Sequence, residues 1–307
     1  MSIANSLRRL QTLQISDCSQ LEKIIQGSEV SNISLQSLRE VKVENCNNLR
    51  YLFPMSIANS LGGLQTLERC FGLEEIIKAK KESNICLYSL MEVFVRECNM
   101  LTSLSSLSHG RILKSLTKLE IYDCLQLEDT FPISMAQGLP LLNEVVLEDL
   151  PQFKERDGNE IVLTLASLHN LAEVSIRDCE NLKYLFPITF AHGGILKLKT
   201  ISLEKVSKLE QVFEGDEANV SKDEEKVLHL PQLTDLKLSG LPNLMSFSPV
   251  SYHFVFPSFE DLEAEGCPNI TTRFSVDSKQ SVHAKTQASQ SDDETILEES
   301  AAAQETT

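Results

Sequence analysis

The chain has 307 residues, of which 44 are acidic and 28 basic, so its formal net charge is -16. This balance argues against DNA or RNA binding, which requires a basic patch, and is typical of a solvated surface. No stretch approaches the roughly 18 consecutive apolar residues of a membrane span, and no secretory signal precedes Leu13.

One pattern of apolar residues recurs from the start of the chain to about residue 270. In its first copy, Leu10, Leu13, Ile15, Cys18 and Leu21 are separated by mainly polar residues. Ten copies place their first strand residue at positions 13, 41, 67, 93, 119, 145, 174, 201, 236 and 262. Most intervals between these positions are 26 to 29 residues, and one is 35.

This spacing is the leucine-rich-repeat signature. The apolar-x-apolar step has period two and predicts a short strand with both apolar side chains on one face. No single copy can bury its apolar set alone, so the copies must stack. We therefore expect an α/β solenoid of about ten repeats over residues 1–270, with a curved parallel sheet on the concave face. Short helices, 3-10 turns and loops should cover the convex face.

Seven of the eight cysteines occupy the same position of the pattern, namely Cys18, Cys46, Cys70, Cys98, Cys124, Cys179 and Cys267. This regularity predicts a column of small buried thiols between stacked units, not a disulfide framework or a metal cluster. Free thiols of this kind are typical of a reducing compartment.

The third copy is damaged. Residues Met1–Leu13 nearly repeat Met55–Leu67, so we expect the array to begin part-way through a unit and to be incomplete at its N-terminus. The spacing from Leu67 to Cys70 is two residues shorter than the spacing from Leu13 to Cys18. This loss predicts a short or irregular strand around Leu67–Arg69.

Three connectors place proline close to Ser, Thr, Ile and Ala, which predicts one or two helical turns on the convex side. They are Ser56–Leu61, Phe131–Ala136 and Leu185–Ala191. The charged insertion 214–226 reads as a solvated loop, with a docking loop as the alternative. Residues 271–307 leave the pattern and are rich in polar residues, so we expect a disordered tail.

The residues that enzymes use do not assemble into a recognisable pattern. The sequence holds no phosphate-binding glycine loop, and its six histidines are scattered among connectors and tail. None pairs with cysteine or an acid at catalytic or zinc-ligand spacing. We therefore expect no enzyme activity, no cofactor and no metal ion.

The predicted concave face is mainly anionic, with an apolar and aromatic island at Phe94, Tyr122 and Val146. The candidate protein-binding residues are Glu92, Phe94, Arg96, Glu120, Tyr122, Glu144, Val146, Glu148 and Arg177. Exposed aromatics beside charges are typical of protein interfaces. Two interpretations stay open, an ordinary sheet surface and a docking patch for a basic protein surface.

The pattern with Cys-x-x-Leu, the connector Leu52–Leu61 and the phrases Ile15–Ile25 and Ile176–Pro187 resemble a known family. It is the C-terminal repeat region of plant intracellular coiled-coil, nucleotide-binding, leucine-rich-repeat disease resistance proteins. The resemblance implies a cytoplasmic module, nucleocytoplasmic or membrane-associated through its partners. It would sense a pathogen effector or a guarded host protein and would inhibit a nucleotide-binding domain that this sequence does not contain.

Two other classes share part of the pattern. The cysteine-bearing frame also resembles the substrate-binding repeats of F-box ubiquitin-ligase adaptors, which would require an upstream F-box. An extracellular receptor would require a signal peptide and flanking cysteine pairs, and neither is seen in this sequence.

Overall fold

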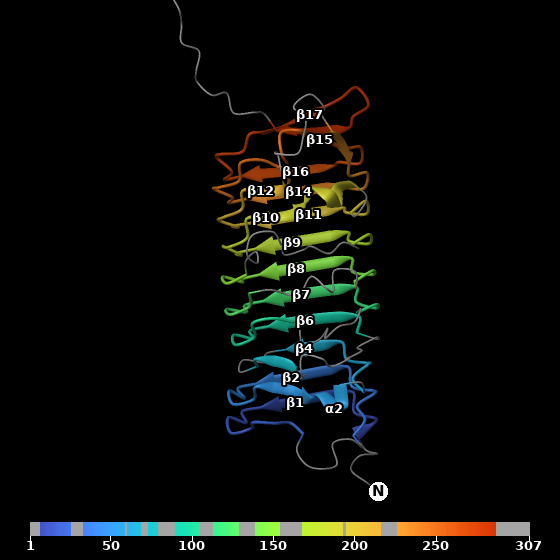
Figure 1. Cartoon of the computed structure of the whole chain (residues 1–307), viewed down its shortest axis with the longest axis vertical. Helices are drawn as coiled ribbons and strands as arrows, with labels where there is room; N and C mark the ends of the chain where they lie inside the picture. The colour runs from blue at the N-terminus through green and yellow to red at the C-terminus, as the bar shows by residue number, and fades with distance from the viewer. Residues whose placement is uncertain are drawn as a thin grey trace, which may run out of the picture.

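In a computed structural model of the chain, the described residues are 7–25, 33–58, 60–68, 73–78, 90–104, 113–128, 139–153, 168–192, 195–215 and 226–286. Parallel strands lie one above another along the long axis of the molecule, from β1 at one end to β16 near the other (Figure 1). This is the parallel solenoid that the repeated pattern predicts.

Each of the ten copies of the pattern contributes one strand to this stack within the described residues. The strands are β1 (Thr12–Ser16), β2 (Glu40–Glu44), β4 (Thr66–Glu68), β6 (Glu92–Arg96), β7 (Lys118–Tyr122), β8 (Glu144–Glu148), β9 (Glu173–Arg177), β11 (Thr200–Glu204), β14 (Asp235–Ser239) and β16 (Asp261–Glu265). In β8, Val145 and Leu147 are fully buried, whereas Glu144, Val146 and Glu148 face the other side. Each buried aliphatic side chain contributes about 1.5–3 kcal/mol, which explains why the units stack.

The turn that follows nine of the ten repeat strands, all except β4, whose following residues lie outside the described chain, accounts for the fixed spacing of the pattern. The first turn residue is left-handed, with φ between 50° and 56° at Asp17, Asn45, Glu97, Asp123, Asp149, Asp178 and Lys205. Glycine takes this position at 240 and 266. The next residue, usually cysteine, then accepts a hydrogen bond from the amide three residues later, as in Leu127 N to Cys124 O at 3.2 Å. The Cys-x-x-Leu spacing is therefore one closed turn.

The predicted cysteine column is present where neighbouring units cover it. Cys46, Cys98, Cys124 and Cys179 are buried free thiols, as expected. Cys18 is exposed and Cys267 is half-buried, because each belongs to a unit at one end of the stack. The two remaining cysteines, at 70 and 86, lie outside the described residues.

The damaged third copy forms a short strand, as predicted, and the sheet is interrupted beside it. Strand β4 has three residues, whereas its neighbours β2 and β6 have five. It pairs with β2 over Thr66–Glu68, but the sheet order within the described chain breaks between β4 and β6. The result is a three-stranded sheet, β1-β2-β4, beside a seven-stranded one, β6-β7-β8-β9-β11-β14-β16.

Shorter strands form a second layer that the sequence analysis did not predict. Strand β3 (Tyr51–Pro54) pairs with β5 (Glu75–Lys78), and β10 (Tyr184–Pro187) pairs with β12 (Gln211–Glu214). Each has two adjacent buried apolar residues, such as Leu185 and Phe186, where a period-two pattern would have one. Because the two buried residues are adjacent, a search for period-two alternation does not detect these strands.

Helical turns follow two of these strands, as predicted. They are α2 (Met55–Ala58) and the 3-10 helix η4 (Ile188–His192). The third predicted helix, at Phe131–Ala136, and residues 216–225 of the charged insertion lie outside the described part of the chain. Within the described residues, no helix combines the length and apolar character needed to cross a membrane.

The disordered tail predicted from residue 271 is wrong for residues 271–286. Strands β17 (Thr272–Val276) and β18 (Val282–Thr286) form an antiparallel hairpin, and β18 also pairs with β15 (Tyr252–Phe256). With β13 (Lys226–His229) they make a four-stranded sheet over the end of the stack. This segment folds because β18 pairs with β15 through its main chain and because Phe274, Val282 and Ala284 pack against the core of the array. Residues 287–307 lie outside the described chain.

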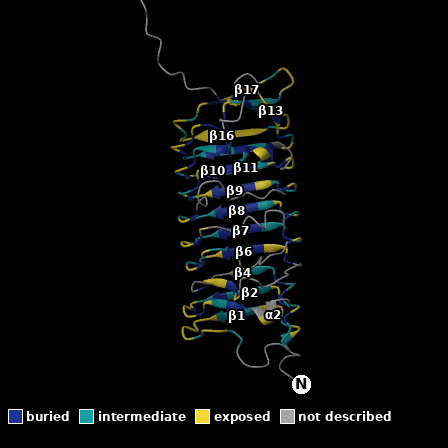
Figure 2. Ribbon diagram, viewed as in Figure 1, coloured by how far each residue is buried: buried dark blue, intermediate teal, exposed yellow. Residues whose placement is uncertain are grey.

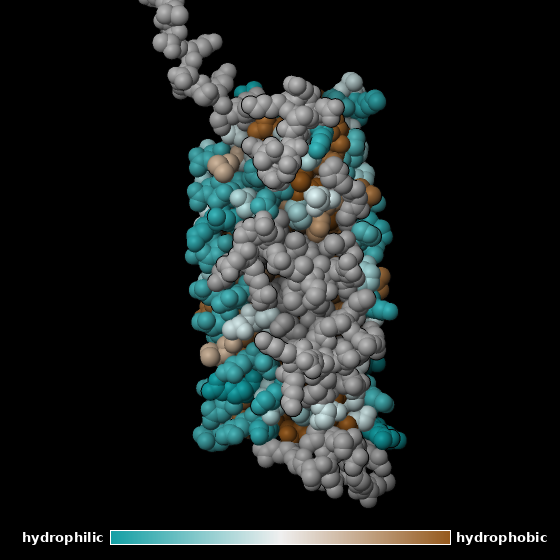
Figure 3. Space-filling model, viewed as in Figure 1, coloured by the Kyte–Doolittle hydropathy of each residue, from teal (hydrophilic) through white to brown (hydrophobic). Residues whose placement is uncertain are grey.

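Aromatic rings fill the interior beneath this terminal sheet. Phe213, Phe247 and Phe254 are fully buried, with ring centroids 4.8 to 5.3 Å apart. In the space-filling view, hydrophobic residues reach the surface near both ends of the stack, and hydrophilic ones line its left margin (Figure 3).

Candidate functional site

The solvent-facing side of the long sheet carries all nine candidate residues, and we call this surface the sheet face. Within β6, β7, β8 and β9 it consists of the first, third and fifth residue of each strand. Residues 92, 118, 144 and 173 form its first row, 94, 120, 146 and 175 its middle row, and 96, 122, 148 and 177 its last row. The parallel register therefore brings residues about 26 to 29 positions apart into direct contact.

Lys118 organises the first row. Its Nζ atom lies 2.6 Å from Glu120 Oε1 and 2.9 Å from Glu144 Oε1. The hydrogen bond to Glu120, and then that to Glu144, raise the pKa of Lys118 above its ordinary value. The same Nζ atom lies 5.7 Å from the centre of the Phe94 ring, within the range of a cation–π contact. Lys118 was not among the predicted site residues.

Glu120 occupies the centre of the predicted apolar island. The register places it between Phe94 and Val146, so the island is divided by a carboxylate. Tyr122 donates its hydroxyl to Glu120 Oε2 at 3.0 Å. Burial, together with this hydrogen bond, raises the pKa of Tyr122 to about 12. The aromatic groups and the acid are thus held as one unit.

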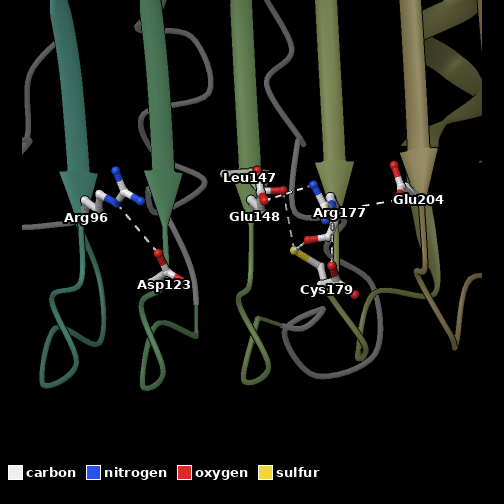
Figure 4. A network of polar contacts seen from close by, with 8 residues as sticks. Arg96, Asp123, Leu147, Glu148, Arg177, Cys179 and Glu204 are labelled. Carbon is white, nitrogen blue, oxygen red and sulfur yellow. Dashed lines mark hydrogen bonds and ion pairs between the residues drawn. The ribbon is translucent and has the colours of Figure 1, made fainter.

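Arg177 connects three strands in the last row. Its guanidinium lies 3.3 Å from Glu148 on β8 and 3.8 Å from Glu204 on β11, and it also contacts Asp178 at 3.2 Å (Figure 4). Glu148, and then Glu204, raise the pKa of Arg177. Cys179 lies beneath this network, with its Sγ atom 3.8 Å from the carbonyl oxygen of Leu147. The arginine is therefore held between two carboxylates.

Arg96 reaches the neighbouring turn at the other end of the same row. Its Nε atom lies 3.6 Å from Glu97 and 3.7 Å from Asp123 (Figure 4). Sequence analysis placed Arg96 on the sheet face but did not identify Asp123 as its partner. The sequence does contain a signal for this contact, because Glu97 and Asp123 each directly precede the cysteine of their own copy of the pattern.

The left-handed turn residues make an acidic column beside the sheet face. The amides of Asp123, Asp149 and Asp178 donate to the last strand residue of the following unit at 3.0 to 3.1 Å. Burial, and then the charges of Asp178 and Asp123, raise the pKa of Asp149. The negative character of the sheet face thus extends past the ends of the strands.

Two exposed glutamates add negative charge to the first row, namely Glu92, which was a predicted site residue, and Glu173, which was not. Glu92 and Glu173 are exposed at either end of the first row, on β6 and β9. With Glu144 they outnumber the single cation of that row, Lys118. The sheet face therefore keeps a net negative charge, although Lys118, Arg96 and Arg177 are each paired with acids.

Among the described residues, the fold brings together one histidine and one acid that the sequence analysis did not pair: His283 Nε2 lies 3.1 Å from Asp277 Oδ2, and His283 Nδ1 lies 2.8 Å from His253 Nε2. No group of three or more His, Cys, Asp or Glu side chains in the described part of the chain is arranged to hold a metal ion. A hollow of about 500 Å³ lies away from the sheet face, near β3 and β5. It is lined by Glu22, Lys23, Asn48, Arg50, Tyr51, Glu74, Glu75 and Lys78. Its charged side chains of both signs, which include the Arg50–Glu74 ion pair, suit water better than an apolar ligand.

The stacked parallel units and their solvent-facing sheet define a leucine-rich-repeat solenoid, a class of repeat domain that typically serves as a non-catalytic protein-interaction module. A family model described as plant disease resistance protein RPS2-like, leucine-rich repeats, matches residues 1–71 and 72–206. The chain belongs to this family, so it is a protein-interaction module of plant immunity, as its sequence resemblance indicates. A comparison with curated proteins finds no match.

Proposed function

We propose that this array is the recognition module of a plant immune receptor and that it holds its partner on the sheet face of β6 to β9. The partner is a pathogen effector, a guarded host protein or the nucleotide-binding domain of a full-length receptor, which the array would keep inactive. The observation that carries this proposal is the arrangement of Phe94, Lys118, Glu120 and Tyr122 as one pre-formed cluster.

The net negative charge of the sheet face favours a partner with a basic surface. Glu92, Glu144 and Glu173 lie in the first row with one lysine between them, which favours a basic protein surface. Phe94 and Tyr122 are half-buried on β6 and β7, so a partner can cover both rings. Aromatic side chains of this kind commonly supply much of the binding energy of an interface.

Pre-organisation supports the same proposal. Lys118 and Tyr122 fix the carboxylate of Glu120, and two acids fix the guanidinium of Arg177. Side chains that are already ordered lose little conformational entropy on binding. The buried free cysteines favour a reducing, intracellular compartment, where the nucleotide-binding domains of this receptor class act.

The experiment measures binding of the full chain to the nucleotide-binding module of an RPS2-like receptor, expressed as a separate polypeptide, by isothermal titration calorimetry. Replacing both Phe94 and Tyr122 with alanine should weaken binding by about 30-fold or more, because one aromatic hot-spot residue contributes roughly 2 kcal/mol or more. Far-ultraviolet circular dichroism checks that the variant remains folded.

A matched control replaces Thr200 and Ser202 with alanine. These residues occupy the first and middle rows on β11, outside the proposed contact surface. The control should bind as tightly as the unmodified chain. Equal affinity of the Phe94→Ala/Tyr122→Ala variant, or equal weakening in the control, would remove the cluster from the interface.

A further inference from the structure

The last strand of the long sheet has one unpaired edge. Strand β16 pairs with β14 on one side, from Asp235↔Asp261 to Ser239↔Glu265. Within the described residues, no strand pairs with its other side, and β16 ends the sheet order. An unpaired edge presents backbone amides and carbonyls that can accept another strand.

The side chains of β16 are open to solvent on both faces. All five of its residues are exposed, whereas the equivalent residues of β14 alternate between half-buried and buried (Figure 2). Leu262 is 38% exposed, although its register partner Leu236 is 1% exposed. An aliphatic residue in a buried position of the pattern is therefore left uncovered.

In the last repeat unit, the side that carries the second layer of strands is covered. The hairpin β17–β18 covers it, with Thr272 accepting a hydrogen bond from the Phe247 amide at 2.7 Å. Thr286 donates its hydroxyl to the carbonyl of Ser248 at 2.8 Å. The end of the solenoid is therefore sealed over the second layer and open at the long sheet, which distinguishes the β16 edge from the rest of the terminus.

The charge of β16 indicates which kind of chain can dock against its open edge. Asp261, Glu263 and Glu265 are the residues of β16 on the sheet face, and Lys237 of β14 lies 3.4 Å from Glu263. Residues 287–307 contain six acidic residues and no lysine or arginine, so their charge opposes docking here. A second copy of the chain carries a net charge of -16 and is opposed in the same way.

We propose that β16 is a docking edge for an extended basic segment of a partner protein, added as a further strand to the long sheet. Main-chain hydrogen bonds hold the segment, as in other strand-addition complexes. Lysine or arginine side chains at alternate positions lie beside Asp261, Glu263 and Glu265, and aliphatic residues between them cover Leu262. This edge is separate from the Phe94 and Tyr122 cluster, so either proposal can fail without the other.

The test uses the full chain and a synthetic peptide of alternating lysine and valine, followed by fluorescence anisotropy. The unmodified chain should bind the peptide, and the backbone amides of Leu262 and Ala264 should become protected from hydrogen exchange. These amides face the open edge, because they alternate with amides directed at β14, such as that of Asp261, which donates to Thr234 O at 3.0 Å. The double substitution Asp261→Lys/Glu265→Lys should weaken binding by about tenfold, because cross-strand charge pairs change from attractive to repulsive. The same peptide with alternate N-methylated residues should lose binding, because it cannot complete the strand ladder.

Two control variants separate edge docking from other attraction. Glu173→Lys reverses an exposed charge of the same sheet on β9, and Phe94→Ala/Tyr122→Ala removes the aromatic cluster. Both should bind the peptide as the unmodified chain does. The proposal is overturned if the N-methylated peptide binds equally well, or if Glu173→Lys weakens binding as much as the β16 substitutions. It is also overturned if light scattering shows a dimer that Leu262→Lys dissociates.

Discussion

Lys118 and Glu144 face each other in register across β7 and β8, with 2.9 Å between Nζ and Oε1. The same ammonium group reaches Glu120 on its own strand, so one cation neutralises part of two carboxylates. On a face that is otherwise rich in acids, this contact makes the surface interaction between β7 and β8 attractive.

Replacing Lys118 with methionine should lower the free energy of unfolding by about 1 kcal/mol, measured by urea denaturation. The substitution keeps the aliphatic stem but leaves Glu120, whose side chain is 13% exposed, without its nearest cation. Lys237→Met is the matched control, because the Lys237–Glu263 pair is 40% and 48% exposed. It should cost only a few tenths of a kcal/mol. Equal losses in the two variants would contradict this account.

Tyr122 should make stability depend on alkaline pH. Its pKa is raised from 10.0 to about 12 in the folded chain, so folding favours the protonated phenol. The stabilisation is complete below pH 10 and is lost as pH rises through about 12. Urea unfolding between pH 8 and pH 11 should therefore show a smaller alkaline decline for Tyr122→Phe than for the unmodified chain. Parallel declines would show that the Glu120–Tyr122 contact does not control the titration.

Thiol reactivity should follow position in the stack. Cys18 is exposed, whereas Cys179 is buried and burial raises its pKa to about 12. The thiolate is the reactive form, so alkylation by iodoacetamide at pH 8 should modify Cys18 quickly and Cys179 only after unfolding. Cys124 should be protected in the same way, because its hydrogen bond to Cys98 and its burial raise its pKa. Mass spectrometry of peptides locates each modified site.

Asp149 should be destabilising at neutral pH. Burial and the charges of Asp178 and Asp123 raise its pKa above 3.8, so folding disfavours its charged form. Asp149→Asn, which tolerates the left-handed turn, should raise the unfolding free energy at pH 7 by a few tenths of a kcal/mol. As pH falls through the folded-state pKa towards 3.8, the unmodified chain should gain stability relative to the variant.

Asp178→Asn provides the comparison for that effect. Asp178 occupies the equivalent turn of the next unit but contacts Arg177 at 3.2 Å. Its substitution removes an ion pair and should leave the chain no more stable at pH 7. If both variants were stabilised equally, the carboxylate column and not the individual environment of Asp149 would explain the gain.

Much of the fold could be predicted because its signals are local. Leu13 and Ile15 show the period-two strand, and Cys18 and Leu21 show the turn that closes after it. The two residues missing before Cys70 shorten β4 as the pattern indicated. The candidate residues from Glu92 to Arg177 also lie on one face, because alternation along each strand fixes the side.

The arrangement within that face could not be read in the same way. The pattern named Phe94, Tyr122 and Val146 as an island, yet the register places Glu120 between Phe94 and Val146. The partners of Arg177 come from units about 27 to 29 residues away on either side, and its rotamer lets the guanidinium contact both. Such choices depend on geometry across strands and not on spacing along one.

The sequence by itself determined the stacked units, the column of thiols and the side of the sheet that faces solvent, since period and spacing act within a single copy. Only the tertiary structure decided that β17 and β18 fold back. The reason is that Thr272 and Thr286 find their hydrogen-bond partners at Phe247 and Ser248, in an earlier unit. It also decided that β16 has an open edge among the described residues, because a strand is paired or unpaired only when its neighbours are in place.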